Sequence, residues 1–332
     1  MTEPGHIDVH HHFVPSFYWE AARRAGVTMS GGALMPDWRP EDTLAMLDER
    51  GVAAALLSVV PPGVYFGDQA QASVLARRCN EFAAELVGDH PDRLGAFAVL
   101  PLPDVDAALT EVGYALDVLG LDGVGLYSNV AGRYLGDPRF EPLFAELDRR
   151  GAVVYLHPAE PPCDPAPGLS LPPWFGEFVF DTTRALTNMV LRGTLERNAR
   201  FTLIVAHAGG TAPYIVNRMT NAWRDMPEAR LAAPEEPLAY LRRLYYDTAS
   251  CGAGHSLRLL RDLVGADRLL VGSDFPFVPA HAVSVLRTRL EDPHFLGVPA
   301  EFLRASALRV FPRFGLVVAE GNEPLVTAAA PR

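Results

Sequence analysis

The chain has 332 residues, of which 49% are hydrophobic and 21% charged, a composition typical of a globular protein with a large core. The net charge of −11, without any clustered basic segment, argues against a nucleic-acid-binding surface. No apolar run is long enough to span a membrane, and no basic and apolar leader begins the chain, so we expect a cytoplasmic protein with no membrane partner.

The counts of cysteine and lysine narrow the possible chemistry. Cys79, Cys163 and Cys251 are odd in number and far apart, which fits neither a disulfide framework nor a CxxC pair. All 29 basic residues are arginine, because the chain contains no lysine. This excludes a Schiff-base lysine, a Walker-type phosphate lysine and a carbamylated lysine that bridges two metal ions.

Short apolar runs alternate with amphipathic segments along the chain. The runs predicted as strands are Ile7–Val9, Ala53–Val60, Leu94–Leu100, Gly123–Tyr127, Val153–Leu156, Phe201–Ala206, Leu244–Thr248 and Leu269–Gly272. The segments predicted as helices are Pro40–Arg50, Ala70–Val87, Val105–Leu119, Phe140–Arg150, Thr182–Arg197 and Ser256–Val264. Eight buried strands that alternate with helices predict an α/β fold, a (β/α)8 TIM barrel.

The barrel is expected to be a single domain over residues 1–316, followed by a C-terminal tail over 317–332. The alternative fold is an open, doubly wound sheet. No Gly-rich dinucleotide-binding motif follows the first strand, and Gly123 and Gly125 lie inside a predicted strand. The closed barrel is therefore preferred.

Two segments are longer than the connections of a compact barrel, Phe13–Trp38 and Pro158–Asp181. We interpret them as loop insertions at the catalytic face that act as lids or pocket walls. Both are rich in aromatic residues, which favours an apolar, aromatic substrate, with Trp174 and Phe180 as candidate contacts. The alternative is that these side chains seal a small satellite core.

Residues with metal-ligand chemistry stand at the ends of four predicted strands. His10 and His12 follow the first strand, His157 the fifth, His207 the sixth and Asp274 the eighth. The carboxyl ends of barrel strands share one rim, where catalytic groups collect. We therefore expect these five side chains to lie close together.

The spacing in IDVHHHF suits a metal site, because residues i and i+2 of an extended segment project to the same side. His10 and His12 can thus bind one ion, while His11 points away and either packs or faces solvent. Three imidazoles and a carboxylate suit zinc or another first-row divalent ion. A tag remnant is a poor explanation, because the histidines are embedded in an apolar segment. Ser273 lacks the GxSxG context of a serine hydrolase.

Four motifs together resemble one enzyme family: HxH after the first strand, His-Pro after the fifth, HAGG after the sixth and GSDFP after the eighth. They are similar to the amidohydrolase superfamily, and more narrowly to its branch of aminocarboxymuconate-semialdehyde decarboxylase-like enzymes. The resemblance covers about residues 6–315. Segments 100–109, 132–154 and 180–185 look most like the salicylate-type members, especially 6-methylsalicylate decarboxylases.

The resemblance implies one divalent ion per subunit, with Zn²⁺ expected and Mn²⁺ as the alternative. It implies that His207 is the unligated acid/base residue, and it leaves open whether His207 or Asp274 donates a proton. An arginine eleven residues beyond this histidine is expected to reach the neighbouring subunit's substrate site, which implies a homodimer. Arg218 stands there, and its alternative role is an ordinary helix arginine at the surface. The implied metal ligands are His10, His12, His157 and Asp274.

The chain departs from the branch at two places. Residues 30–37 contain no arginine where the semialdehyde decarboxylases carry one that binds substrate, so muconate semialdehyde is a doubtful substrate. Ser306-Ala307 stands where the branch has Asn-Ala, which we interpret as a change around the site with little effect on chemistry.

The expected function is metal-dependent, non-oxidative decarboxylation of a small aromatic acid, an ortho-hydroxybenzoate like 6-methylsalicylate. The metal would chelate the carboxylate and the phenolate, the ring carbon would be protonated, and carbon dioxide would leave. The alternative is a hydrolase in which metal-activated water attacks an ester, a lactone or an amide. A catalytically inactive metal-binding scaffold is a third reading, against which the presence of all five site residues argues.

Overall fold

Eight parallel strands form one sheet whose first and last strands meet. The structure, a computed structural model, describes residues 5–162, 171–251, 254–283, 290, 292 and 296–315. The strands, in order around the sheet, are β1 (His6–Phe13), β4 (Val52–Val59), β5 (Leu94–Val99), β6 (Gly123–Tyr127), β9 (Val153–His157), β10 (Thr202–Val205), β11 (Tyr245–Asp247) and β12 (Leu269–Leu270). Val9 N donates to Val271 O and closes the ring between β12 and β1. The predicted TIM barrel is confirmed.

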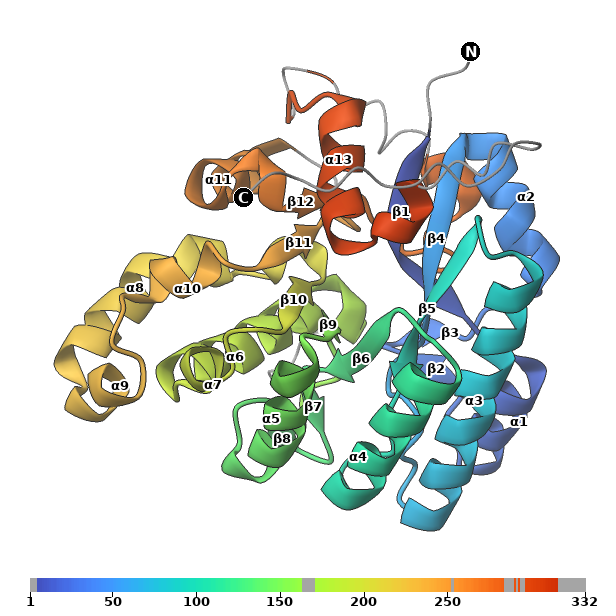
Figure 1. Cartoon of the computed structure of the whole chain (residues 1–332), viewed down its shortest axis with the longest axis horizontal. Coiled ribbons are helices and arrows are strands. Elements are labelled where there is room, and N and C mark those ends of the chain that lie inside the picture. The colour runs from blue at the N-terminus through green and yellow to red at the C-terminus, as the bar shows by residue number, and fades with distance from the viewer. Residues whose placement is uncertain are drawn as a thin grey trace, which may run out of the picture.

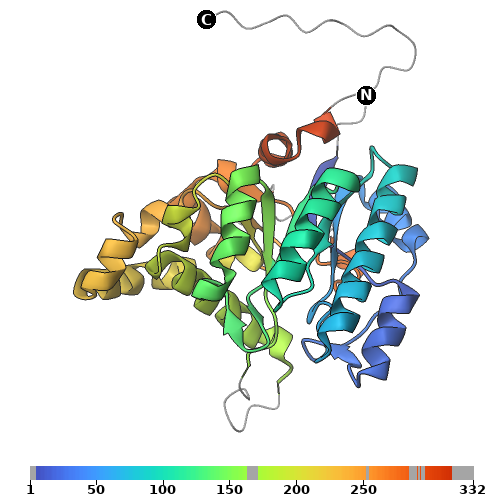
Figure 2. The same cartoon turned by 60° about the horizontal axis from the view of Figure 1, so that its bottom comes forward.

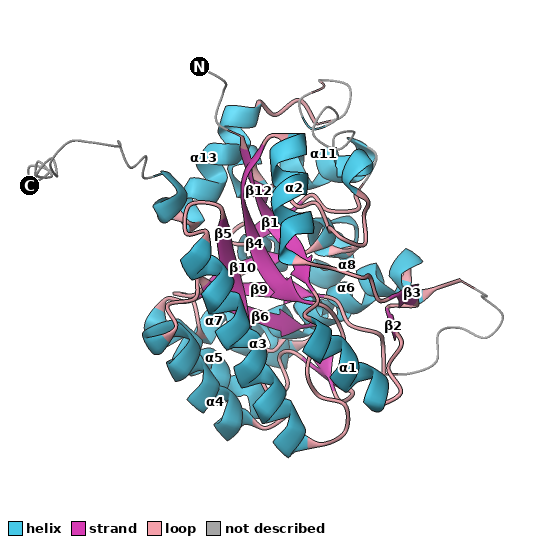
Figure 3. Cartoon of the chain, turned by 90° about the vertical axis from the view of Figure 1, so that its right-hand side faces the viewer, coloured by secondary structure: helices cyan, strands magenta, loops and turns pink. Residues whose placement is uncertain are grey.

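Helices surround the strands (Figures 1 and 3). The helices of the barrel are α2 (Pro40–Arg50), α3 (Gln69–Asp89), α4 (Val105–Gly113), α5 (Glu141–Arg150), α6 (Glu177–Leu191), α7 (Thr194–Arg197), α8 (Ala212–Asp225), α9 (Pro227–Ala232), α10 (Pro237–Leu241), α11 (Gly254–Val264) and α13 (Ala300–Val310). The neighbouring helices α3 and α4 lie side by side on the outside of the sheet (Figure 2). No helix of the described residues is long and apolar enough to cross a membrane.

Local sequence explains why α2 has the predicted bounds. Pro40 occupies the first helical position, where a missing N–H costs nothing, and the Asp42 side chain accepts from the backbone N of Arg39 at 3.0 Å. Gly51 ends the helix in the left-handed conformation, with φ of 63°. The chain then turns directly into β4.

Two apolar cores hold the barrel together. The inner core fills the barrel with side chains such as Ile7, Val9, Phe97 and Tyr155, and Phe311, just after α13, covers one end. The outer core lies between strands and helices and is much larger. Polar side chains that face the other end of the barrel therefore stand on a rigid, filled scaffold.

The first long segment is an insertion, as predicted, but the prediction of a plain loop was wrong, because part of it is helical. Residues Ser16–Arg24 form helix α1, and β2 (Met29–Ser30) pairs with β3 (Ala33–Leu34) in a hairpin that lies apart from the barrel strands (Figure 3). Tyr18 is fully buried and its hydroxyl donates to Gly63 O at 2.9 Å. Burial of such aromatic side chains is what makes the segment fold back as a helix.

The second long segment is partly helical, because α6 already begins at Glu177. The predicted helix Thr182–Arg197 is interrupted at Gly193, which has φ of 72° and separates α6 from α7. Residues 163–170, with Cys163, lie outside the described residues, as does the predicted tail at 317–332.

Candidate metal centre

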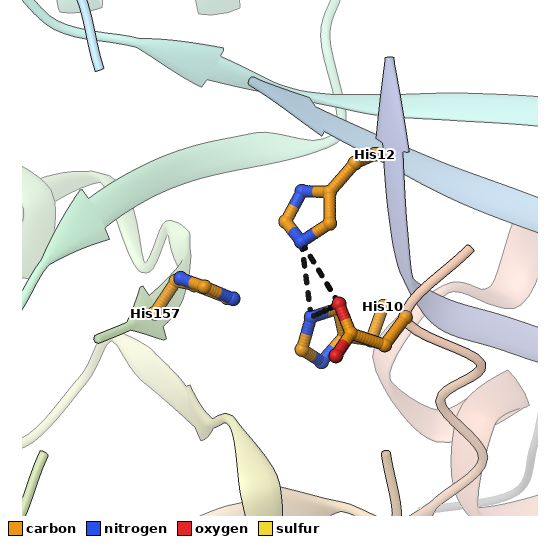
Figure 4. A group of neighbouring side chains, drawn as sticks. His10, His12 and His157 are labelled. Carbon is orange, nitrogen blue, oxygen red and sulfur yellow. Dashed lines mark hydrogen bonds and ion pairs between the residues drawn. The ribbon is translucent and has the colours of Figure 1, made fainter. Parts of the chain in front are cut away.

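Four side chains from three places in the chain meet at one end of the barrel. His10 and His12 lie on β1, His157 ends β9, and Asp274 follows β12. One ligand atom from each residue lies within 4.8 Å of the others. The rings of the three histidines converge on one point (Figure 4). All three histidines are buried.

The separations fit a single ion. His10 Nε2 lies 3.2 Å from His12 Nε2, and Asp274 Oδ1 lies 3.3 Å from the first and 3.4 Å from the second. Two ligands bound about 2.0–2.1 Å from one ion at a tetrahedral angle are about 3.4 Å apart. The distances between these three ligand atoms therefore fit binding to one shared divalent ion.

The second ring nitrogen of each histidine is engaged elsewhere. His10 Nδ1 donates to Asp247 Oδ2 at 2.9 Å, and His157 Nδ1 donates to Pro158 O at 2.8 Å. His12 Nδ1 lies 3.3 Å from Ser58 O. With these bonds in place, Nε2 is the ring nitrogen that faces the cluster, and His157 Nε2 is buried without a hydrogen-bond partner among the described residues. Metal-binding histidines are held in this way.

The charges around the cluster favour a cation. Burial lowers the pKa of His10, but Asp247 and Asp274 outweigh it and raise this pKa to about 10. Burial and the neighbouring histidines hold the pKa of His157 well below its ordinary value. Burial raises the pKa of Asp274, but His10 and its hydrogen bonds outweigh this and hold it well below its usual range. Burial raises the pKa of Asp247 as well, but His10 outweighs it and holds this pKa below its usual value. Both carboxylates are thus ionised, and a metal ion must displace a proton from His10.

His207 lies beside this cluster but outside the group of four. Its Nε2 is 3.4 Å from Asp274 Oδ2, an oxygen that also accepts from Ser250 Oγ at 2.9 Å. Its Nδ1 is buried without a hydrogen-bond partner among the described residues. His207, Ser250 and Asp274 all have positive φ, of 52°, 54° and 63°. Strained backbone of this kind persists where the surrounding structure fixes it, often at functional sites.

Asp247, at the end of β11, is a residue that the sequence reasoning missed. Its Oδ2 accepts from His10 Nδ1 and from Tyr155 OH at 3.0 Å. Its Oδ1 accepts from the backbone N of His207 at 2.9 Å and of Ala249 at 3.0 Å. One buried carboxylate thus fixes both a candidate ligand and the candidate acid/base residue. The signal was available, since Asp247 is a charged residue at the end of a predicted strand.

His11 points away from the other histidines, and of the two predicted possibilities, packing or exposure to solvent, the structure shows packing. It is buried, its Nδ1 donates to Asp8 Oδ2 at 3.0 Å and its Nε2 lies 2.9 Å from Thr43 Oγ1. Its ring lies against Phe275. His11 therefore belongs to the wall of the barrel.

The predicted substrate contacts lie farther out. Trp174 and Phe180 are 52% and 46% exposed, and Arg218 is exposed on α8. The rings beside the cluster are Tyr155, 5.5 Å from the His10 ring, Phe178, 6.1 Å from the His157 ring, and Phe277, 5.6 Å from the His12 ring. The aromatic side chains next to the cluster therefore come from β9, from α6 and from the segment after Asp274.

The sequence and fold match known proteins over most of their length. Residues 7–292 match the amidohydrolase family. A 6-methylsalicylic acid decarboxylase of Aspergillus aculeatus is 36% identical, over 95% of this chain and 98% of the relative. A gamma-resorcylate decarboxylase of Rhizobium sp. is 30% identical, over 80% of this chain and 82% of the relative.

Two solved structures share the whole architecture. One is an amidohydrolase with a TM-score of 0.86 and 30% identity, which covers 93% of this chain and 100% of its own. The other is a 2,6-dihydroxybenzoate decarboxylase complexed with 2,6-dihydroxybenzoate, with a TM-score of 0.73, 25% identity, and coverage of 94% of this chain and 100% of its own. Sequence, fold and the geometry of the polar cluster agree: the chain belongs to the amidohydrolase family.

Proposed function

We propose that the protein is a metal-dependent, non-oxidative decarboxylase of a small aromatic acid, an ortho-hydroxybenzoate similar to 6-methylsalicylate. The relatives named above act, by their names, on 6-methylsalicylic acid and gamma-resorcylate. The observation that carries the proposal is the cluster itself, in which four ligand atoms face one point with His207 beside them. Such a site can bind an acid at the ion and deliver a proton next to it.

His10, His12, His157 and Asp274 are proposed to hold the ion. When bound there, a divalent ion supplies positive charge that stabilises the carboxylate and the neighbouring phenolate of the substrate. Three imidazoles and one carboxylate oxygen favour Zn²⁺, with Mn²⁺ as the alternative. Elemental analysis of the purified protein, followed by reconstitution of the metal-stripped protein with each ion, decides between them.

The hydrogen bonds favour His207 as the proton donor. Both oxygens of Asp274 are already engaged. Oδ2 accepts a hydrogen bond from the Ser250 hydroxyl, and Oδ1 lies next to Nε2 of His10 and of His12. His207 Nε2, 3.4 Å from Asp274 Oδ2, can carry a proton at the edge of the cluster. The proton would go to the ring carbon that bears the carboxylate. The bond to the carboxylate then breaks, its electron pair returns to the ring and carbon dioxide leaves.

The buried rings beside the cluster can exclude water from the reacting carbon. Phe178 is 7% exposed and Phe277 is half-buried, and both contact ligand histidines. An apolar wall strengthens the electrostatic interactions of the site. Trp174 and Phe180 keep their proposed role as outer contacts of the aromatic substrate.

We also propose a homodimer in which Arg218 reaches the partner's substrate. Arg218 and Tyr214, which is 81% exposed, lie on α8, and α8 packs against α6, which carries the exposed Phe180. Helices α8 and α9 extend to one side of the barrel (Figure 1). Exposed aromatic residues around an arginine are typical of an interface. Light scattering measures the mass, and mixing inactive Arg218→Ala and His207→Gln proteins should restore part of the activity only if the two residues act across subunits.

Product analysis tests the reaction. Metal-replete protein is incubated with a panel of ortho-hydroxybenzoates headed by 6-methylsalicylate, and the products are identified by mass spectrometry. We expect 3-methylphenol from the lead compound, no product without metal or with Asp274→Asn, and at least about a 100-fold lower kcat for His207→Gln with metal content unchanged. Turnover of esters or lactones without loss of a carboxylate would instead support the hydrolase.

A further inference from the structure

The first strand changes phase between Val9 and His10. Ile7 and Val9 both face the inner core, as alternation requires, but His10 also faces the inside of the barrel, at the metal centre. The pairing with β4 passes from Asp8 opposite Ala55 to His11 opposite Leu57, so three steps on β1 face two on β4. This extra residue is a β-bulge. Without it, His10 and His12 would face the helices.

Asp8 binds the backbone that the bulge leaves unpaired. Its carboxylate is 1% exposed and accepts four hydrogen bonds. Oδ1 accepts from the backbone N of His10 at 3.1 Å and of Ser273 at 2.9 Å. Oδ2 accepts from Ser273 Oγ at 2.6 Å and from His11 Nδ1 at 3.0 Å. One side chain therefore joins the bulge of β1 to the residue that precedes Asp274.

This junction lies where the barrel closes with few backbone bonds. Strand β12 has only two residues, and its continuation meets β1 through isolated bridges at Asp8 with Val271 and at His11 with Phe275. Between the bridges, Asp274 N donates to His10 O at 2.9 Å. Three of the four proposed ligands stand at this seam. The Asp8 carboxylate ties the two sides of the seam together at the level of the ligands, and Ser273 Oγ, 3.3 Å from His10 O, adds a second side-chain contact across it.

His11 fixes Asp8 from the outside. Trp38 Nε1 donates to Thr43 Oγ1 at 2.9 Å, and the Thr43 hydroxyl can donate to His11 Nε2, also at 2.9 Å. His11 Nδ1 is then the donor to Asp8. In this series of hydrogen bonds from Trp38 to Asp8 every donor has an acceptor, so none of these buried polar groups is left without a hydrogen-bond partner. Helix α2, which carries Thr43, is thereby linked to the seam.

We infer that Asp8 is a positioning residue for the metal ligands, and that His11, the middle histidine of the HHH run, serves to hold Asp8. Together with Ser273 they stabilise the bulge that turns His10 and His12 toward the ion and set the position of Asp274. The inference rests on the proposed metal site and is independent of the substrate. Residues that orient ligands from outside typically contribute 10- to 100-fold to metal affinity.

Three variants test this inference through metal binding. Asp8→Asn keeps the size but offers an N–H2 group to the donors on Ser273 and His11, His11→Phe removes the donor to Asp8, and Ser273→Ala removes the hydroxyl. Metal-stripped proteins are titrated with Co²⁺ and Zn²⁺ against a chromophoric chelator. The Co²⁺ absorption spectrum gives the coordination, and circular dichroism gives the folded fraction. We expect at least about tenfold weaker binding for Asp8→Asn and a smaller loss for the other two.

Asp122→Asn is the matched control. Asp122 also accepts a backbone N–H across neighbouring strands, from Ala96 at 2.9 Å, and it pairs with Arg313 away from the metal cluster. The Asp122→Asn substitution should lower the melting temperature without changing metal affinity. Wild-type affinity in folded Asp8→Asn and His11→Phe would overturn the inference, and if Asp8→Asn does not fold, His11→Phe and Ser273→Ala decide. A wild-type protein that binds no divalent ion would instead refute the proposed function.

Discussion

Replacing Asp247 by asparagine should weaken metal binding without any change in the ligands themselves. The carboxylate of Asp247 accepts four hydrogen bonds, two at each oxygen. An asparagine can keep its oxygen toward the backbone N–H groups of His207 and Ala249. Its N–H2 group then faces His10, whose Nδ1 must become an acceptor. The His10 proton moves to Nε2, the atom proposed to bind the ion.

The size of the effect follows from that hydrogen bond. His10 Nδ1 donates to a buried, ionised carboxylate at 2.9 Å, and such a bond contributes about 1.5–3 kcal/mol. Since 1.4 kcal/mol corresponds to a factor of ten, we expect the dissociation constant to rise about 10- to 100-fold. The free energy of unfolding should fall by about 1–3 kcal/mol, because Tyr155 also loses its acceptor.

The assay is chelator competition on metal-stripped protein, with chemical denaturation in parallel. Tyr155→Phe is the matched control, because it removes a 3.0 Å hydrogen bond to the same oxygen of Asp247 and leaves His10 in place. It should change metal affinity by less than about threefold while it destabilises the fold. A folded Asp247→Asn protein that binds metal as tightly as wild type would refute the reasoning.

Three further outcomes are expected. Gly272→Ala should weaken metal binding and lower the free energy of unfolding by about 1–3 kcal/mol, because the added Cβ would lie 2.7 Å from His10 Cβ. Gly88→Ala is the control: no atom lies within 4 Å of the added Cβ, and the change should stabilise helix α3 by about 0.5 kcal/mol. Because the pKa of His10 is raised to about 10, titrations at several pH values should show Co²⁺ affinity rising about tenfold per pH unit from about 6.5 to about 9, and a flat profile would contradict this. Hydrogen bonds from Arg149 and then Arg150 lower the pKa of Glu146 from 4.5 to about 2, so its ionised form stabilises the fold above pH 4.5 and this stabilisation is lost as the pH falls to 2. In thermal unfolding, the Glu146→Gln protein should therefore lose less stability than the wild type between pH 4.5 and 2.

Local pattern was sufficient to predict the barrel and the end of it at which His10, His12, His157 and Asp274 meet. The strand Gly123–Tyr127 and the helix Pro40–Arg50 have the predicted bounds, because buried apolar runs, a first-turn proline and a terminal glycine act locally. The His and Asp residues at the ends of the predicted strands indicated that these side chains meet at one end of the barrel. Helix α1 was missed because its aromatic residues were interpreted as pocket walls, whereas burial of Tyr18 against the loop after β4 stabilises the helix.

Asp247 could be singled out by its place at the end of a predicted strand, but its role, like that of Asp8, depends on contacts between distant segments. Asp8 meets Ser273 across the closing seam, and Asp247 at the end of β11 meets His10 on β1, two strands away around the barrel. The bulge in β1 also depends on its pairing with β4. Alternation alone predicted that His10 and His12 share a side, but not that an extra residue turns that side inward.

Isotope labelling tests directly whether the protein is a decarboxylase. The metal-loaded protein is given 6-methylsalicylate labelled with ¹³C at the carboxyl group, in D₂O, and both products are analysed by mass spectrometry and NMR. We expect one ¹³CO₂ for each substrate consumed and 3-methylphenol with a single deuterium on the carbon between the hydroxyl and methyl groups, both dependent on the metal. A product that keeps the ¹³C label, or no turnover by protein with a full complement of metal, would contradict it.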